Sequence, residues 1–346
     1  MVIVFGCKKF QLTGGAAASM RFEFIGGGSI GLLYASRLAL AGYPVTVWTR
    51  TEEQAEELAR HGITLIDLDG RRRQAAVTAR WLQVGTCSIH EQELGRAEEE
   101  SWIWLTVKQP QIDGSLLEQV GQLSIGTNGV LCLQNGIGHM EKLSAYVPSE
   151  QLYASVTTEG ARRIDSCTVA YTGSGELTYG SYYPQVPGGG RDAHPIRLAE
   201  LLNQAGITSN LSKEIKDKLY QKLLINAVIN PLTALFDVTN GELPKSSTRL
   251  RLMHALYLES AGVLAAAGWK DSGESWSRIL QVCENTSANT SSMLGDVRAG
   301  RLTEIDWING GVAALGAEVG QETPLNEAAI YMIKSLLPAE EGEQPS

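Results

Sequence analysis

The first feature with chemical potential is a lysine and two asparagines set into an apolar segment. Lys222, Asn226 and Asn230 lie four residues apart among leucines, isoleucines and valines. Because an α-helix turns by about 100° per residue, this spacing puts all three side chains on one stripe. Such a stripe meets water, a satisfied polar patch in the core, or a ligand for which the lysine could supply charge and a proton. Pro231 follows directly and lacks a backbone N–H, so we expect it to bend or end the helix after Asn230.

A glycine-rich turn near the start of the chain has the context of a dinucleotide site. Residues 21–25 have a strand pattern, residues 32–40 a helix pattern and residues 45–48 a second strand pattern. A strand, glycine turn, helix and strand within about 30 residues form the fingerprint of a dinucleotide-binding unit. The helix N-terminus would bind the pyrophosphate, and the alternative is a tight turn without a ligand. The residues of the turn are Gly26, Gly27, Gly28, Ser29, Ile30 and Gly31.

Three polar residues stand at the ends of predicted strands, where ligands bind in open α/β sheets. Arg50 follows residues 45–48, at a place where NAD sites usually have an acid. A guanidinium there can pair with a 2′-phosphate, which favours NADP(H) over NAD. Lys108 and Asn135 follow two apolar strand patterns. We expect all three on the cofactor side, where Lys108 could bind a ribose, a phosphate or the substrate carboxylate, and Asn135 a nicotinamide ribose or the substrate. Solvated side chains, or a helix cap for Asn135, are the alternatives.

The pattern of apolar residues changes once along the 346-residue chain, which is long enough for about two domains. Strand patterns alternate with helices up to residue 210, and helical periodicity then continues to about residue 337. We therefore predict an α/β Rossmann-type domain over residues 20–210 and an all-α domain over residues 211–338. Residues 1–19 lack the features of a signal peptide, and we expect a disordered extension before a natural start at Met20. Residues 339–346 form an acidic tail.

Composition limits the classes of partner. The net charge is −9 and no long basic run occurs, which argues against nucleic acid as a partner. No apolar run reaches the roughly 18 residues needed to span a bilayer, so we expect no membrane partner and a cytoplasmic location. The five cysteines contain no CxxC pair and the five histidines show no ligand spacing, so we expect no metal site. The sequence does not fix the oligomeric state, and a homodimer is compatible with it.

The helical half contains a second group of polar residues. Ser291 and Ser292 fall within residues 273–294, which have the periodicity of one helix, although serine is a poor residue inside helices. Glu304 follows Thr303, a candidate helix cap. A helix end and a first-turn acid would explain these residues without a ligand. The other interpretation is that Ser292 and Glu304 contact the substrate, since a cofactor domain needs a partner domain that binds the substrate.

Taken together, these motifs resemble those of the ketopantoate reductase (2-dehydropantoate 2-reductase) family. The resemblance covers residues 20 to about 337, with the motifs in the same order and no departure at a motif position. The segment beginning at Lys222 and the pairing of Ser292 with Glu304 are more specific than the glycine turn. The matching segments are the glycine turn and residues 106–108, 133–138, 222–234, 240–243, 291–293 and 303–306.

The resemblance implies an activity and a role for each residue. The family reduces 2-dehydropantoate to (R)-pantoate with NADPH in pantothenate and coenzyme A biosynthesis, transferring hydride to the C2 ketone. Lys222 would be the general acid, its pKa lowered by burial and raised by a nearby carboxylate. The small 2-keto acid would be bound by Asn226, Asn230, Ser292 and Glu304. A related NADP-dependent reductase of another small 2-keto acid, and a non-catalytic NADP-sensing protein, are the alternatives.

Overall fold

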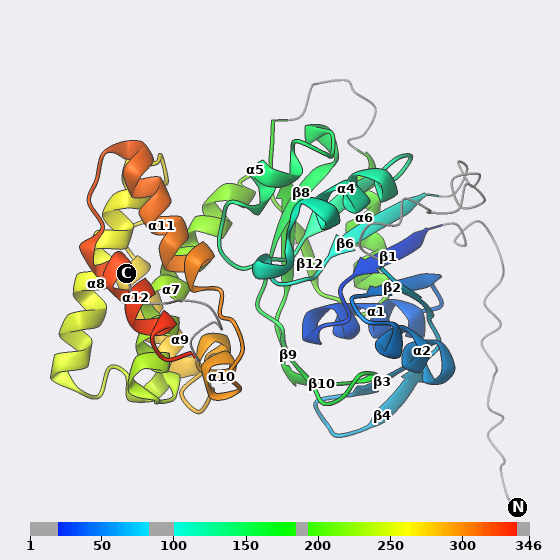
Figure 1. Cartoon of the computed structure of the whole chain (residues 1–346), viewed down its shortest axis with the longest axis horizontal. Coiled ribbons are helices and arrows are strands. Elements are labelled where there is room, and N and C mark those ends of the chain that lie inside the picture. Colours follow the sequence, from blue (N-terminus) through cyan, green and yellow to red (C-terminus); the bar gives the residue numbers. More distant parts are fainter. Residues whose placement is uncertain (1–19, 83–99, 185–192, 338–346) are drawn as a thin grey trace, which may run out of the picture.

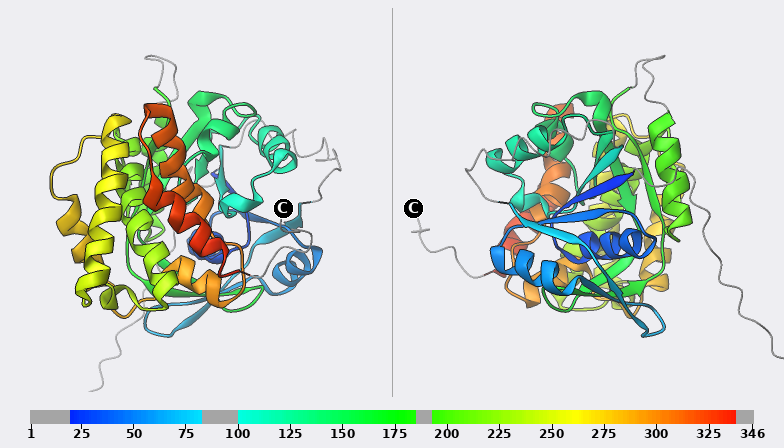
Figure 2. Two further views of the ribbon diagram at one scale, coloured as in Figure 1. Left: turned by 60° about the vertical axis from the view of Figure 1, so that its left-hand side comes forward. Right: turned by 90° about the vertical axis from the view of Figure 1, so that its right-hand side faces the viewer.

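The computed structural model describes residues 20–82, 100–184 and 193–337. The predictions for residues 1–19 and 339–346 lie outside these ranges. An α/β part built around a twisted sheet lies beside a part made only of helices, as the Rossmann-type and all-α prediction requires (Figure 1). Figure 2 shows the same arrangement from two further sides.

The larger sheet has eight strands in the order β12-β11-β8-β7-β6-β1-β2-β5. All neighbouring pairs are parallel except β8 with β11. The central strands β1 and β6 are rich in large apolar residues, as strands covered on both faces should be. The strands are β1 (Arg21–Ile25), β2 (Val45–Thr49), β5 (Thr78–Trp81), β6 (Ser101–Leu105), β7 (Gly129–Cys132), β8 (Leu152–Thr157), β11 (Leu177–Ser181) and β12 (Ser209–Leu211).

A smaller sheet and several helices complete the α/β part. The smaller sheet has the order β4-β3-β10-β9 and packs against α1. Its strands are β3 (Ile63–Ile66), β4 (Arg72–Ala75), β9 (Gly160–Arg163) and β10 (Thr168–Gly173). The α-helices of this part are α1 (Ser29–Leu40), α2 (Glu52–His61), α4 (Gly114–Leu123), α5 (His139–Leu143) and α6 (Ala193–Gln204), and the 3₁₀ helices are η1 (Gln109–Gln111) and η2 (Ser149–Gln151).

The helical part begins with α7, which passes through Pro231 without ending. The helix extends over Ile215–Phe236, so the expectation that Pro231 ends it after Asn230 is wrong. The packing of its buried residues outweighs the loss of one backbone hydrogen bond. The other elements are η3 (Asn240–Glu242), α8 (Ser247–Ala266), α9 (Ser275–Asn285), α10 (Ser292–Arg298), α11 (Ile305–Val319) and α12 (Pro324–Lys334).

Helix α7 belongs to two hydrophobic cores. Ile215 and Leu219 pack with sheet residues such as Leu105, whereas Leu223 and the buried residues after it pack among the other helices. The last strand ends at Leu211 and α7 begins four residues later. We therefore propose that the boundary between the two domains lies near residue 211.

The described ranges contain neither a membrane-spanning helix nor a group of metal-ligating side chains. Within residues 20–82, 100–184 and 193–337, no helix is both long and apolar enough to cross a membrane. Over those same residues, no three His, Cys, Asp or Glu side chains are grouped so that they could hold a metal ion.

Candidate active site

The register of the large sheet aligns the carboxyl ends of its central strands. Ile25, the last residue of β1, pairs with Trp48 on one side and with Leu105 on the other. Leu105 in turn pairs with Cys132, the last residue of β7. The polar residues that follow these strands therefore lie along one edge of the sheet; they are Arg50, Lys108 and Asn135, together with the glycine turn.

The glycine turn is closely packed at Gly26 and Gly31 and open at Gly28. Gly26 has a φ of 117°, and a Cβ there would lie 2.8 Å from the backbone nitrogen of Val107. A Cβ on Gly31 would lie 2.1 Å from the carbonyl oxygen of Gly26, so helix α1 can pack against β1 only with glycine there. A Cβ on Gly28 would lie no closer than 4.0 Å to any atom beyond the adjacent residues, the nearest being the Thr106 carbonyl oxygen. This leaves the backbone at the N-terminus of α1 accessible to a phosphate group.

Two side chains from distant segments contact this turn and were not predicted. Gln54 in α2 donates from Nε2 to the Gly27 carbonyl at 2.8 Å. Arg163 in β9 donates from Nη1 to the same carbonyl at 3.1 Å, and its backbone N–H donates to Ser29 Oγ at 3.0 Å. No periodicity links a glycine turn to a strand more than 130 residues later, so the sequence held no signal for Arg163.

Arg50 is exposed at the end of β2. Its carbonyl accepts a hydrogen bond from Trp81 Nε1 at 3.2 Å, which connects β2 to the end of β5. Among the residues that the structure describes, no acceptor is hydrogen-bonded to its guanidinium. The side chain is therefore available for a ligand, as a 2′-phosphate site requires.

Two ion or hydrogen-bond pairs join the strand edge to the helical part. Lys108 Nζ lies 2.5 Å from Oδ2 of Asp296, a buried residue of α10 that also accepts from Arg301 Nε at 3.0 Å. Asn135 Nδ2 donates to Oε2 of Glu304, the buried N-cap residue of α11, at 3.0 Å. The expectation that Thr303 caps this helix is wrong, because α11 begins at Ile305 and Glu304 is its N-cap residue. Asn135 of the predicted strand edge thus contacts Glu304 of the second predicted polar group, between the two parts.

Gly136 explains how Asn135 comes so close to α11. It has a φ of 79°, and a Cβ there would lie 2.3 Å from the carbonyl oxygen of Trp307. The next residue, Ile137, donates its backbone N–H to that same carbonyl at 3.1 Å. The turn after β7 therefore packs backbone to backbone against the first turn of α11, which only glycine permits.

Lys222 on α7 lies close enough to Glu304 for the two charges to influence each other. It is partly buried, and its Nζ donates to the carbonyl of Thr157, the last residue of β8, at 3.0 Å. Burial lowers the pKa of Lys222 to about 8, an effect that the nearby carboxylate of Glu304 opposes. Burial likewise raises the pKa of Glu304, against the hydrogen bond from Asn135 and the positive charges of Lys108 and Lys222. The Lys222 ammonium and the Glu304 carboxyl group therefore share one site from which water is largely excluded.

The remaining predicted substrate contacts lie on α7 and α10. Asn226 and Asn230 follow Lys222 along one face of α7, partly buried and buried respectively, and no described side chain is hydrogen-bonded to either amide. Ser292 is exposed in the first turn of α10. The predicted helix over residues 273–294 is wrong, because the chain breaks between α9 and α10 and Ser291 caps the second helix. Buried Ser291 also contacts α7, accepting from Thr233 Oγ1 at 2.7 Å.

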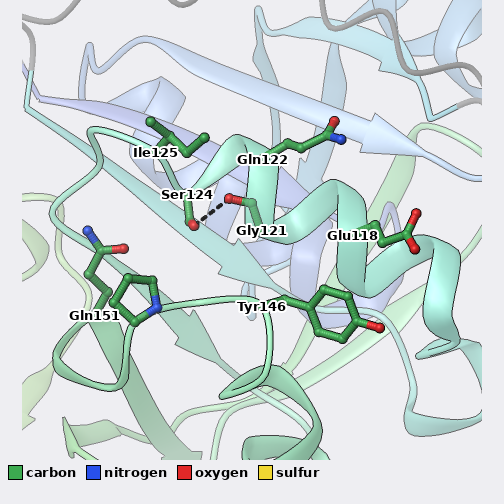
Figure 3. Close-up of a pocket in the computed structure, with 8 residues that line it drawn as sticks. Glu118, Gly121, Gln122, Ser124, Ile125, Tyr146 and Gln151 are labelled. Atoms are coloured by element: carbon green, nitrogen blue, oxygen red, sulfur yellow. Dashed lines mark hydrogen bonds between the residues drawn. The ribbon is translucent and has the colours of Figure 1, made fainter.

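A separate hollow of about 600 Å³ lies on the α/β part. Figure 3 shows it between the end of α4 and the segment that leads to β8, with Tyr146 and Gln151 on one side and Glu118 on the other. Ser124 donates from Oγ to the Gly121 carbonyl at 2.7 Å in its wall. None of its lining residues belongs to the predicted site, and the chemistry described above is located elsewhere.

Comparison with known proteins covers both parts of the chain. A family model described as Ketopantoate reductase PanE/ApbA matches residues 23–184, and one for the C-terminal part of the same family matches residues 214–336. A 2-dehydropantoate 2-reductase of Bacillus subtilis (strain 168) is 34% identical over 295 residues, which is 84% of this chain and 89% of the relative. One of Archaeoglobus fulgidus is 27% identical, over 91% of this chain and 97% of the relative.

Solved structures extend the comparison to three dimensions. The crystal structure of a probable 2-dehydropantoate 2-reductase from Bacillus subtilis has a TM-score of 0.74 and 32% identity, over 91% of this chain and 99% of that chain. The ternary structure of D-mandelate dehydrogenase with NADH and anilino(oxo)acetate has a TM-score of 0.80 and 26% identity, over 92% and 98%. Similar folds therefore accompany two different 2-keto or 2-hydroxy acid substrates.

Proposed function

Since this chain belongs to the ketopantoate reductase family of oxidoreductases, we propose that it reduces 2-dehydropantoate to (R)-pantoate with NADPH, in pantothenate and coenzyme A biosynthesis. The observation that carries the proposal is the state of Lys222. Its ammonium is desolvated, has a pKa near 8 and lies beside Glu304, between the sheet edge and the helical part. A lysine in that state can donate a proton at neutral pH.

The cofactor would lie along the sheet edge. The turn from Gly26 to Gly31 would bind the pyrophosphate, Arg50 the 2′-phosphate, and Lys108 and Asn135 the ribose or nicotinamide end. Bound NADPH supplies the hydride, and the chain supplies position and electrostatics. The open backbone at Gly28 fits such a ligand, as does the guanidinium of Arg50, which is hydrogen-bonded to no acceptor in the described part of the chain. NADH is the alternative cofactor, because D-mandelate dehydrogenase binds it.

The helical part would bind the keto acid. Asn226, Asn230 and Ser292 offer neutral donors to its carboxylate. Lys222 would exchange the Thr157 carbonyl for the ketone oxygen and give that oxygen a proton as the alkoxide develops. Glu304 would orient the ammonium or accept a hydrogen bond from a substrate hydroxyl.

A second candidate is the reduction of a different small 2-keto acid. The likeness to D-mandelate dehydrogenase favours it, since that structure was solved with anilino(oxo)acetate, an aryl oxamate that resembles an aromatic 2-keto acid in shape and charge. The same lysine could protonate either ketone, and the side chain of the acid would decide between them. A cytoplasmic location and a homodimer accompany both candidates as proposals.

The test is NADPH oxidation by the full-length chain, followed by absorbance with a panel of keto acids. We expect the highest kcat/KM with 2-dehydropantoate, compared with pyruvate, 2-oxoisovalerate and phenylglyoxylate, and a lower kcat/KM with NADH. Preference for phenylglyoxylate would support the second candidate instead. If no 2-keto acid is reduced with either nucleotide, both candidates are wrong.

A further inference from the structure

One backbone carbonyl in the middle of α7 has lost its helical partner. The carbonyl of Ala227 would normally accept from the N–H of the residue four positions later, but that residue is Pro231, which has none. Ala227 is fully buried, so water cannot replace the missing donor without opening the core. Asn309 of α11 replaces it, donating from Nδ2 to the Ala227 carbonyl at 3.0 Å.

Asn309 is itself held by a chain of hydrogen bonds that begins at the partly buried Glu259 and passes through buried Asn326. Oε1 of Glu259 on α8 accepts from both the backbone N–H and Nδ2 of Asn326, each at 2.8 Å. Since a carboxylate only accepts, Asn326 must turn its Oδ1 toward Asn309, which donates to it at 2.9 Å. Asn309 then faces an acceptor on both sides, and its own Oδ1 has no partner among the described residues. The carboxylate of Glu259 thereby fixes the direction of every bond up to Ala227.

The carbonyl of Ala227 lies in the same turns of α7 as the proposed substrate stripe. Ala227 directly follows Asn226, and the missing bond would have joined it to position 231, directly after Asn230. Asn309 lies five residues after Glu304, near the start of the same helix. Helix α11 therefore presents the carboxylate that influences Lys222 and also holds the backbone that carries the stripe, and α7, α11 and α12 pack against one another (Figures 1 and 2).

From this geometry we infer that Asn309 is a positioning residue for the reduction, acting through the Ala227 carbonyl to fix the α7 backbone between Asn226 and Asn230. This inference rests on the proposed function of the site. Asn309 does not touch the substrate; it sets where the stripe lies relative to Glu304. A specific consequence follows. A residue with an N–H at position 231 would satisfy the carbonyl from within the helix, and Asn309 would then be dispensable.

The experiment is a double-mutant cycle between Asn309→Leu and Pro231→Ala in the full-length chain. Because small displacements of catalytic groups are costly, we expect Asn309→Leu to lower kcat with 2-dehydropantoate by about tenfold or more. The Kd for NADPH should stay within about twofold, since the sheet edge is unchanged. In the double variant, kcat should return to within about threefold of wild type, because the helix supplies the missing donor.

The control variant is Leu264→Ala, which removes apolar volume from the same helical core without touching a hydrogen bond. It should lower the melting temperature, as Asn309→Leu does, while kcat stays within about twofold. If Asn309→Leu leaves kcat unchanged, or if Pro231→Ala fails to rescue it, the inference is wrong. Glu259→Gln provides a second route if Asn309→Leu does not fold; it removes the carboxylate that orients the chain and should lower kcat in the same direction.

Thermal unfolding separates failure of this inference from failure of the proposed function. An unsatisfied buried carbonyl destabilises the fold whatever the substrate, so Asn309→Leu should lower the melting temperature by roughly 5 °C. Most of that loss should disappear in the Pro231→Ala background. If the melting temperatures show this coupling but no keto acid is reduced by wild type, the proposed function is wrong and the hydrogen bond stands. If the two losses simply add, Asn309 does not act through Ala227.

Discussion

Replacement of Lys222 by methionine is the most direct perturbation of the proposed chemistry. Methionine keeps much of the length and apolar character of the side chain but removes the ammonium that donates to Thr157 at 3.0 Å. The proposed cofactor contacts along the sheet edge do not involve Lys222 and should remain intact. We therefore expect the variant to bind NADPH with unchanged affinity and to lose turnover.

The size of the loss follows from the state of the lysine. Burial lowers the pKa of Lys222 from 10.5 to about 8, so the ammonium is a stronger acid than an exposed lysine yet remains mostly protonated at neutral pH. A positioned general acid of this kind contributes about 10²–10⁴-fold. At 1.36 kcal/mol for each factor of ten, this corresponds to about 2.7–5.4 kcal/mol of transition-state stabilisation. The wild-type kcat/KM for reduction should hold below pH 8 and fall about tenfold per pH unit above it, because the deprotonated amine cannot donate.

The assay is NADPH oxidation at varied concentrations of 2-dehydropantoate across a range of pH, which gives both kcat and kcat/KM, with nucleotide affinity measured separately. Lys218→Met is the matched control, since Lys218 is exposed one turn earlier on α7. The control should keep wild-type turnover and the fall in kcat/KM above pH 8. Lys222→Met should lose both the turnover and this pH dependence. If Lys222→Met retains turnover within a few-fold of wild type, or keeps the same fall above pH 8, Lys222 is not the general acid.

Three further predictions concern Arg50, the carboxylate that influences Lys222, and the turn after β7. Arg50→Ala should raise the KM for NADPH about tenfold or more and leave the KM for NADH within twofold, measured by initial rates, because only NADPH has the 2′-phosphate; equal effects on both nucleotides would contradict the NADP assignment. Glu304→Gln should move the fall in kcat/KM to lower pH, since the carboxylate raises the pKa of Lys222; a pH profile with an unmoved or higher midpoint would refute the coupling. Gly136→Ala should destabilise the fold by more than Gly138→Ala in thermal unfolding, because both have positive φ, costing about 1–2 kcal/mol, but only Gly136 has the α11 backbone against it; equal losses would show that this contact is unimportant.

Local chemistry made much of the fold and of the cofactor edge predictable. The glycine turn, its flanking strands and the polar residues after each strand are local patterns, and parallel strands end at one edge. The pairing of Asn135 with Glu304, 169 residues apart, could not be read from the sequence in this way. Periodicity states which face of an element is polar but not which distant element that face meets.

Pro231 illustrates where a local rule fails for an identifiable reason. The rule that proline ends a helix assumes that the freed carbonyl finds no other donor. Here Asn309 supplies one from 82 residues away, and apolar packing stabilises the turns on both sides. Ser291 is a similar case, since its buried bond to Thr233 depends on α10 meeting α7. Such compensations are tertiary, so only the folded structure reveals them.

The division of α7 between two cores has a mechanical consequence. Leu219 is the last buried residue of this helix in the core with the sheet, and Leu223 is the first in the core of the helical part. Lys222 lies between them, at the point where the helix leaves one body and enters the other. Any rotation of one part against the other about this segment would therefore move the Lys222 ammonium less than it moves groups far from α7. Under the proposed function, ligands could therefore enter between the two parts while the proposed proton donor stays almost in place.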